Sequence, residues 1–155
     1  MRRRRNQLGL TLVELIVAFT IMTLLTALAL PLARFKVRRE KERELRYALT
    51  DIRKAIDKYK DACDGNKIPQ KMGTDCYPET LEQLVEGVKM ANDANGKKIK
   101  FLRRLPRDPF TRSTEWGMRS TQDDPTSTGW GGQNIFDVYT KSMEKAPDGT
   151  LYSEW

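Results

Sequence analysis

Apolar residues are unevenly distributed along the 155-residue chain. The run Leu10–Leu32 is apolar apart from a few small polar side chains, and its only strongly polar member is Glu14. About 20 consecutive apolar residues are enough for a helix to cross the hydrocarbon core of a bilayer. The pattern therefore predicts a transmembrane helix over residues 10–33.

A second helical pattern follows this run. Apolar side chains recur there at spacings of three and four, with acidic and basic residues between them: Leu45, Ala48, Leu49, Ile52, Ala55, Ile56 and Tyr59. Such a stripe is typical of a helix that packs one face on a core. We expect the first helix to continue as an amphipathic helix over residues 34–62. Pro31 removes one backbone hydrogen bond and is expected to kink or loosen the helix.

The remaining chain predicts short elements separated by loops. Tyr77–Lys89 reads as a turn and a short helix, and Lys98–Phe110 as a short strand followed by a proline-bounded turn. Asn134–Thr140 and Thr150–Trp155 read as further strands. The predicted fold class is α+β, with one long N-terminal helix whose outer half packs on a small antiparallel sheet.

The charge pattern adds little evidence for a nucleic-acid partner. The net charge is +7, but Arg2–Arg5 supply four of these charges, and the rest of the chain holds 24 basic and 21 acidic residues. These alternate in stretches such as "RREKERELR", which is typical of a solvated helix face. We predict no specific nucleic-acid binding.

The chain has no histidine and no glycine-rich phosphate-binding motif. Histidine is the usual general base and the commonest metal ligand. We therefore predict that the protein is not an enzyme.

The N-terminal sequence "RRRRNQLG" followed by "LTLVELIVAF" resembles the class III leader of type IV pilins and type II secretion pseudopilins. The resemblance implies that a prepilin peptidase removes residues 1–9 by cutting between Gly9 and Leu10. The new amine of Leu10 is then methylated, although the family usually has phenylalanine there. The apolar helix stays as both membrane anchor and filament core. Glu14 matches the glutamate at the fifth mature position, which acts in assembly.

Elementary electrostatics supports this role for Glu14. An isolated acidic side chain at a bilayer centre costs roughly 2.5–3.5 kcal/mol on insertion scales, and an amine on a neighbouring subunit would offset that cost. The alternative is that Glu14 only reaches to the lipid headgroups. Two other interpretations of the segment remain. A plain anchor leaves Gly9 and Glu14 unexplained, and ordinary secretory cleavage predicts a soluble binding domain that starts at Arg34.

The two cysteines bear on orientation. Basic residues flank both ends of the apolar run, so charge alone does not orient it. Cys63 and Cys76 bracket a loop rich in glycine and proline, and two cysteines in an exported domain of this size favour one disulfide. The alternative is a pair of free thiols, because a metal site is poorly supported without histidine. We therefore expect residues 63–155 to form a periplasmic globular domain attached to the inner membrane.

The order of "LPRDPF", "FDVYT", "PDG" and a terminal tryptophan resembles the major pseudopilin of type II secretion. That resemblance implies a structural subunit that forms a homopolymer, the periplasmic pseudopilus, which helps to drive protein export. Its partners would be minor pseudopilins and an inner-membrane assembly platform. The alternative is a type IV pilus subunit for adhesion, motility or DNA uptake.

The resemblance also implies calcium in the last loop, with Asp148 and Glu154 as ligands and Asp137 as a further candidate. Calcium prefers six to eight oxygen ligands, and few carboxylates are present here. The alternative is that Asp148 and Gly149 form a hairpin turn and that no cofactor is bound.

If no calcium is bound, another contact must hold the C-terminal end of the chain in place. Tyr152 and Trp155 are then expected to bury aromatic area beside Phe136 and Val138.

Overall fold

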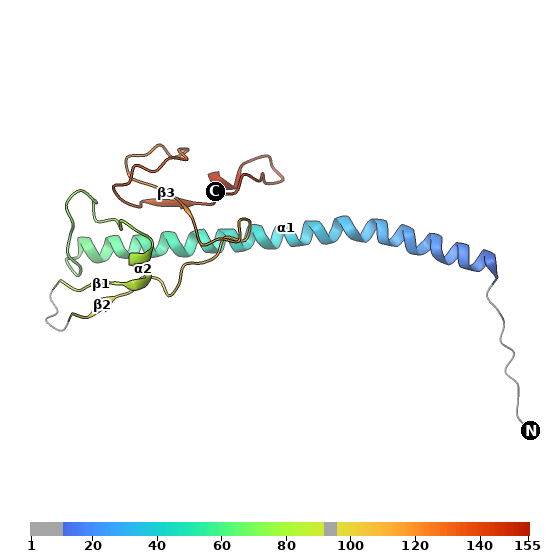
Figure 1. The fold of residues 1–155 in the computed structure, drawn as a ribbon, viewed down its shortest axis with the longest axis horizontal. Helices are drawn as coiled ribbons and strands as arrows, with labels where there is room; N and C mark the ends of the chain where they lie inside the picture. The colour runs from blue at the N-terminus through green and yellow to red at the C-terminus, as the bar shows by residue number, and fades with distance from the viewer. Residues whose placement is uncertain (1–10, 92–95) are drawn as a thin grey trace, which may run out of the picture. The chain divides into compact units, whose positions relative to one another are not determined.

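The computed structural model describes residues 11–91 and 96–155. The chain divides into two compact units, residues 1–40 and residues 41–155. Helix α1 (Leu12–Asp64) contributes to both units and is helical across position 31 (Figure 1). It ends two residues after Ala62, which confirms the predicted long helix. The fold is α+β and consistent with a pilin-like fold.

The core of the second unit is built on one face of α1. The predicted stripe is buried there from Leu45 to Ile56, Tyr59 is half-buried, and Leu45 and Ile52 are completely inaccessible to solvent. Residues from the rest of the unit complete the same apolar cluster: Leu81, Leu84, Trp116, Ile135, Val138, Ala146 and Tyr152. The 3.6-residue period thus defined the buried face of the helix correctly.

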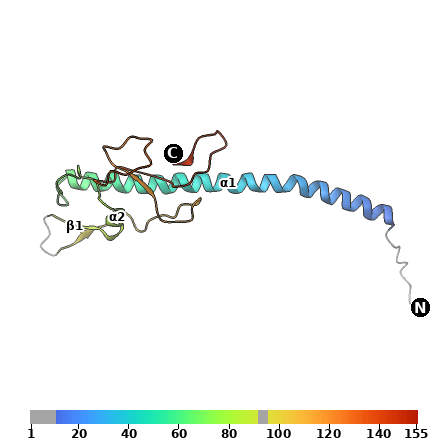
Figure 2. The same cartoon turned by 45° about the horizontal axis from the view of Figure 1, so that its top comes forward.

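Short elements surround this part of α1. Helix α2 (Glu82–Glu86) is followed by β1 (Val88–Lys89) and β2 (Lys98–Ile99), which pair antiparallel. Strands β3 (Gly117–Arg119) and β4 (Asp137–Tyr139) form a second antiparallel pair, and a 3-10 turn, η1 (Tyr152–Glu154), follows. The β1–β2 hairpin and the C-terminal loops lie on opposite sides of α1 (Figures 1 and 2). Two small sheets therefore take the place of the one expected.

Helix α2 is shorter than the predicted Tyr77–Lys89 segment. Gly87 has a φ of +82°, a conformation that glycine adopts without strain, and it ends the helix. Val88 therefore leaves the helical pattern and pairs with Ile99 in the first sheet.

The prediction of a strand over Thr150–Trp155 is wrong. Only Leu151 makes an isolated bridge, to Lys145, and the chain then coils into η1. The amide of Trp155 donates to the carbonyl of Tyr152 over 3.2 Å, and the two rings meet edge to face with their centroids 4.9 Å apart. Aromatic packing thus overrides the local preference of this segment for strand.

Strand β3 was not predicted, because it begins with a glycine and carries an arginine. Gly117 lies directly beneath the ring of Tyr139, and a Cβ atom at this position would collide with that ring. The strand therefore depends on close approach to β4, a feature that local propensity does not reveal.

Candidate functional site

The first turn of α1 holds the candidate assembly residue. Thr11 caps the helix, since its hydroxyl accepts a hydrogen bond from the Glu14 amide over 3.3 Å. The sequence Thr-x-x-Glu is the signature of such a cap, and Thr11 is a residue that sequence reasoning missed. Glu14 is exposed, and its carboxylate has no partner among the described residues. Gly9 and Leu10, the predicted cleavage site, lie outside the residues that the structure describes.

An exposed apolar surface follows this turn. The large apolar side chains from Leu12 to Leu25 are between 52% and 73% exposed within the single chain. Contiguous apolar surface of this kind marks a site of interaction with protein or membrane. Within residues 11–91 and 96–155, no helix combines the length and the apolar content that crossing a membrane requires. The transmembrane helix over residues 10–33 stays a prediction.

Three threonines interrupt this apolar surface. The hydroxyls of Thr20, Thr23 and Thr26 donate to the carbonyls four residues earlier, over 2.7, 3.0 and 2.8 Å respectively. Each hydroxyl proton is therefore satisfied within the helix. The segment can enter apolar surroundings without leaving these donors unsatisfied.

Residues 4–30 match the prokaryotic N-terminal methylation motif. The chain is type IV pilin-like in this segment. The motif implies processing by a prepilin peptidase and polymerisation, and it indicates a membrane-anchored subunit of a pilus or pseudopilus. No curated protein and no solved structure matches the chain.

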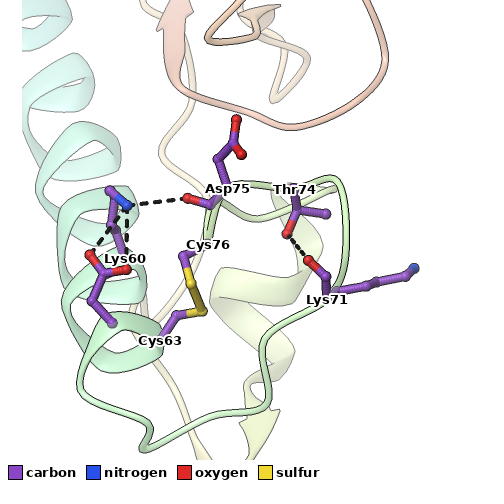
Figure 3. The surroundings of a disulfide bond; sticks show 7 residues. Lys60, Cys63, Lys71, Thr74, Asp75 and Cys76 are labelled. Atoms are coloured by element: carbon purple, nitrogen blue, oxygen red, sulfur yellow. Dashed lines mark hydrogen bonds and ion pairs between the residues drawn. A yellow bond between two sulfur atoms is a disulfide. The ribbon is translucent and has the colours of Figure 1, made fainter.

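The predicted disulfide is confirmed in this pilin-like chain. Cys63, near the end of α1, is bonded to Cys76, and their Cα atoms are 5.6 Å apart. Closing a loop of this length stabilises the fold by about 3 kcal/mol on the chain-entropy model. Figure 3 shows Lys60 beside the bond, where it pairs with Asp64 over 3.2 Å and donates to the carbonyl of Asp75 over 3.2 Å. The loop is therefore fixed at both ends.

Two of the sequence segments that resemble the major pseudopilin meet in the structure. Asp108, from "LPRDPF", is fully buried, and its carboxylate accepts a hydrogen bond from the Phe110 amide over 2.8 Å. The same carboxylate accepts a hydrogen bond from the hydroxyl of Thr140, from "FDVYT". At the start of the first segment, the Trp116 indole donates to the carbonyl of Pro106 over 3.1 Å. Asp108 thus links the two segments through a buried hydrogen bond.

Arg53 organises the end of the chain, and sequence reasoning missed it. Its guanidinium donates to the Asp137 carboxylate over 2.6 Å and to the carbonyls of Val138 and Trp155 over 3.2 and 2.8 Å. Arg119 lies 3.6 Å from the same Asp137 carboxylate. One arginine therefore connects α1, β4 and the last residue. The only signal in the sequence was a basic residue directly beside the buried stripe.

Aromatic contacts complete this arrangement. The fully buried ring of Tyr152 stacks on Phe110 with the centroids 4.2 Å apart, and its hydroxyl donates to Glu42 over 2.7 Å. The guanidinium of Arg46 lies 4.1 Å from the centre of the Trp155 ring. The predicted aromatic anchor is thus present, with Val138 in the same core. Phe136 is instead 50% exposed and contacts Tyr77, so its predicted place beside Tyr152 is wrong.

The candidate calcium ligands fit that ion poorly. Asp148 accepts hydrogen bonds from the hydroxyl and the amide of Thr150, and these lower the pKa of its carboxyl. The carboxylate of Asp137 is engaged by arginines. The residues that the structure describes contain no group of three or more acidic, histidine or cysteine side chains that could hold a metal. Asp148 and Gly149 form the turn of a small hairpin closed by the bridge between Lys145 and Leu151.

We expect calcium to leave the stability of the full chain unchanged. The melting temperature, followed by circular dichroism in detergent, should agree within about 1 °C between millimolar calcium and a chelator. If calcium did bind, a hundredfold excess over its dissociation constant would stabilise the fold by about 2.7 kcal/mol, which this measurement would detect. Magnesium at the same concentration is the control for ionic strength. A calcium-specific rise of several degrees that Asp148→Ala abolishes would contradict this expectation.

Proposed function

We propose that the chain is the major subunit of a periplasmic pseudopilus that helps to drive protein export through a type II secretion system. The N-terminal motif supports a filament subunit of the pilus or pseudopilus type. The assignment to the major pseudopilin is supported by the contact between Asp108 and Thr140, which joins two of the segments on which the resemblance to that protein rests.

In this proposal, the chain acts by assembly and not by catalysis. The exposed apolar face of α1 packs against the same face of other copies, and Glu14 selects the stagger by pairing with the amine of a neighbouring subunit. The globular unit, held by the disulfide and by Arg53, forms the outside of the filament. Growth of the filament from an assembly platform in the inner membrane would then push folded substrates toward an outer-membrane channel.

Deletion of the gene tests the proposal in the source organism. We expect proteins normally found in the medium to accumulate in the periplasm, while surface piliation and twitching motility stay unchanged. The wild-type gene should restore export, and a Glu14→Gln copy should not. Loss of motility or DNA uptake with normal export would instead assign the chain to a surface type IV pilus.

Processing can be tested independently of the secretion pathway. Intact-mass measurement of the chain from membranes should show loss of Met1–Gly9 and the addition of one methyl group at Leu10. Co-expression with and without a prepilin peptidase provides the control. A mature chain that begins at Arg34 would contradict the prediction.

A further inference from the structure

The globular unit has an open groove lined mainly by basic side chains. The groove lies between α1 and the segment 101–107 and has a volume of about 750 Å³. Cationic residues come from both sides, with one carboxylate among them: Lys54 and Lys58 from α1, Arg103, Arg104 and Arg107 from the segment, and Asp51. Two rows of positive charge thus face the same space.

The charges in the groove are available to a ligand. All five cationic residues are exposed, and among the described residues none of them has an ion pair or a hydrogen-bond partner. Arg53 and Arg119, elsewhere in this unit, are both paired with Asp137. Cations held close together without partners repel each other, so an anionic ligand would be attracted to the groove.

The wall that carries the arginines is fixed before any ligand binds. The amides of Phe101 and Leu102 donate to the carbonyl of Leu84 over 3.0 and 2.9 Å. The indole of Trp116 holds the carbonyl of Pro106, and the Phe101 ring packs against Tyr59 with the centroids 5.2 Å apart. Because the backbone of this wall is already ordered, ligand binding would lose little conformational entropy there.

Apolar side chains lie between the cationic residues. Ala55 is buried, and the others are half-buried: Phe101, Leu102, Leu105 and Pro106. This combination suits a ligand that carries carboxylates and apolar groups together. The planar guanidinium group matches a carboxylate through two parallel hydrogen bonds.

A nucleic acid matches the groove less well than an acidic peptide does. A phosphodiester chain carries a negative charge at every residue and would bring charge against Asp51 in the groove, and against the exposed Asp57 and Asp61 on the same helix. A peptide carries its carboxylates at discrete positions and can offer apolar side chains to the remaining surface.

We propose that this groove is a docking site for an acidic, amphipathic polypeptide segment of a partner protein. The proposal does not depend on whether the filament serves secretion or a surface pilus. Arg103 and Arg104 on one side and Lys54 and Lys58 on the other hold the carboxylates of the segment. Its apolar side chains lie on Phe101 and Leu105.

Fluorescence anisotropy with the full chain in a non-ionic detergent tests the proposal. The probe is a labelled 14-residue peptide of glutamate and leucine placed at helical spacing, and the matched peptide has glutamine in place of glutamate. We expect the glutamate peptide to bind about tenfold more tightly, with an affinity that falls as salt rises.

Variants then locate the binding surface. Arg103→Ser with Arg104→Ser should weaken binding of the glutamate peptide about three- to tenfold, the range expected for two exposed charge pairs. Lys54→Ser with Lys58→Ser, on the opposite wall, should have the same effect. The matched control is Lys97→Ser with Lys98→Ser, which removes two exposed charges outside the groove and should change the affinity less than twofold.

Three results would overturn the proposal. One is equal binding of the two peptides, and a second is an equal loss of affinity in the groove variants and the control. The third is tighter binding of a single-stranded oligonucleotide of the same charge, lost in both groove variants, because the groove would then recognise phosphate. Melting temperatures equal to that of the wild type establish that the variants are folded, as expected for side chains without partners.

Discussion

Replacing Glu14 by glutamine should leave the chain in the membrane and reduce the yield of filament about tenfold or more. The substitution keeps the shape of the side chain and removes its charge, which makes insertion of the helix easier. Filament formation suffers because the amine of a neighbouring subunit loses its counter-charge in apolar surroundings. Breaking one partner of a buried ion pair costs about 3–5 kcal/mol.

Sheared filaments quantified by immunoblot, beside the amount of protein in the membrane fraction, measure this effect. Glu14→Asp retains the charge and should restore part of the yield. Thr23→Ala, in the same apolar segment, removes a hydroxyl that is bonded only within the helix and should leave assembly intact. A normal yield of filament from Glu14→Gln would rule out the pairing.

Replacing Tyr152 by alanine should lower the melting temperature of the full chain by about 10–20 °C. The side chain is completely buried and stacks on Phe110, and truncating a large buried aromatic residue costs about 3–5 kcal/mol. Tyr152→Phe keeps the ring and removes the hydroxyl that donates to Glu42, so its cost should be about 1–2 kcal/mol.

Tyr47 provides the matched control for this experiment. It is also a tyrosine, it lies on α1, and it is 66% exposed. Tyr47→Ala should change the free energy of unfolding by about 0.5 kcal/mol or less. Thermal unfolding monitored by circular dichroism distinguishes the three variants. Equal destabilisation by the two alanine variants would show that η1 does not anchor the end of the chain.

The features that could be predicted were those that repeat along the sequence or that occur in one short motif. The stripe from Leu45 to Tyr59 defined the buried face of α1, because every turn of the helix repeats the same requirement. Cys63 and Cys76 are the two cysteines of the chain, so their pairing followed once the domain was expected to lie in the periplasm, where disulfides form. The N-terminal motif combined Gly9 and Glu14 at a fixed spacing.

The features that could not be predicted depend on contacts between distant segments. Strand β3 can pair with β4 because Gly117 has no Cβ atom, which leaves room for the ring of Tyr139 directly above it. Arg53 looks like one more charge on a solvated helix until Asp137 and Trp155 come within reach of it. The basic groove joins residues about 50 positions apart, and its charges are available because none of its five cationic side chains has a partner among the described residues.

The disulfide also determines whether proteolytic cleavage in its loop separates the chain into two fragments. Met72 lies inside the closed loop and is 98% exposed, and exposed loop tips are the preferred sites of proteolytic nicking. A single cut beside Met72 would leave both fragments joined through Cys63 and Cys76. Such a nicked subunit would keep the size of an intact one on a non-reducing gel and would separate into two pieces only after reduction.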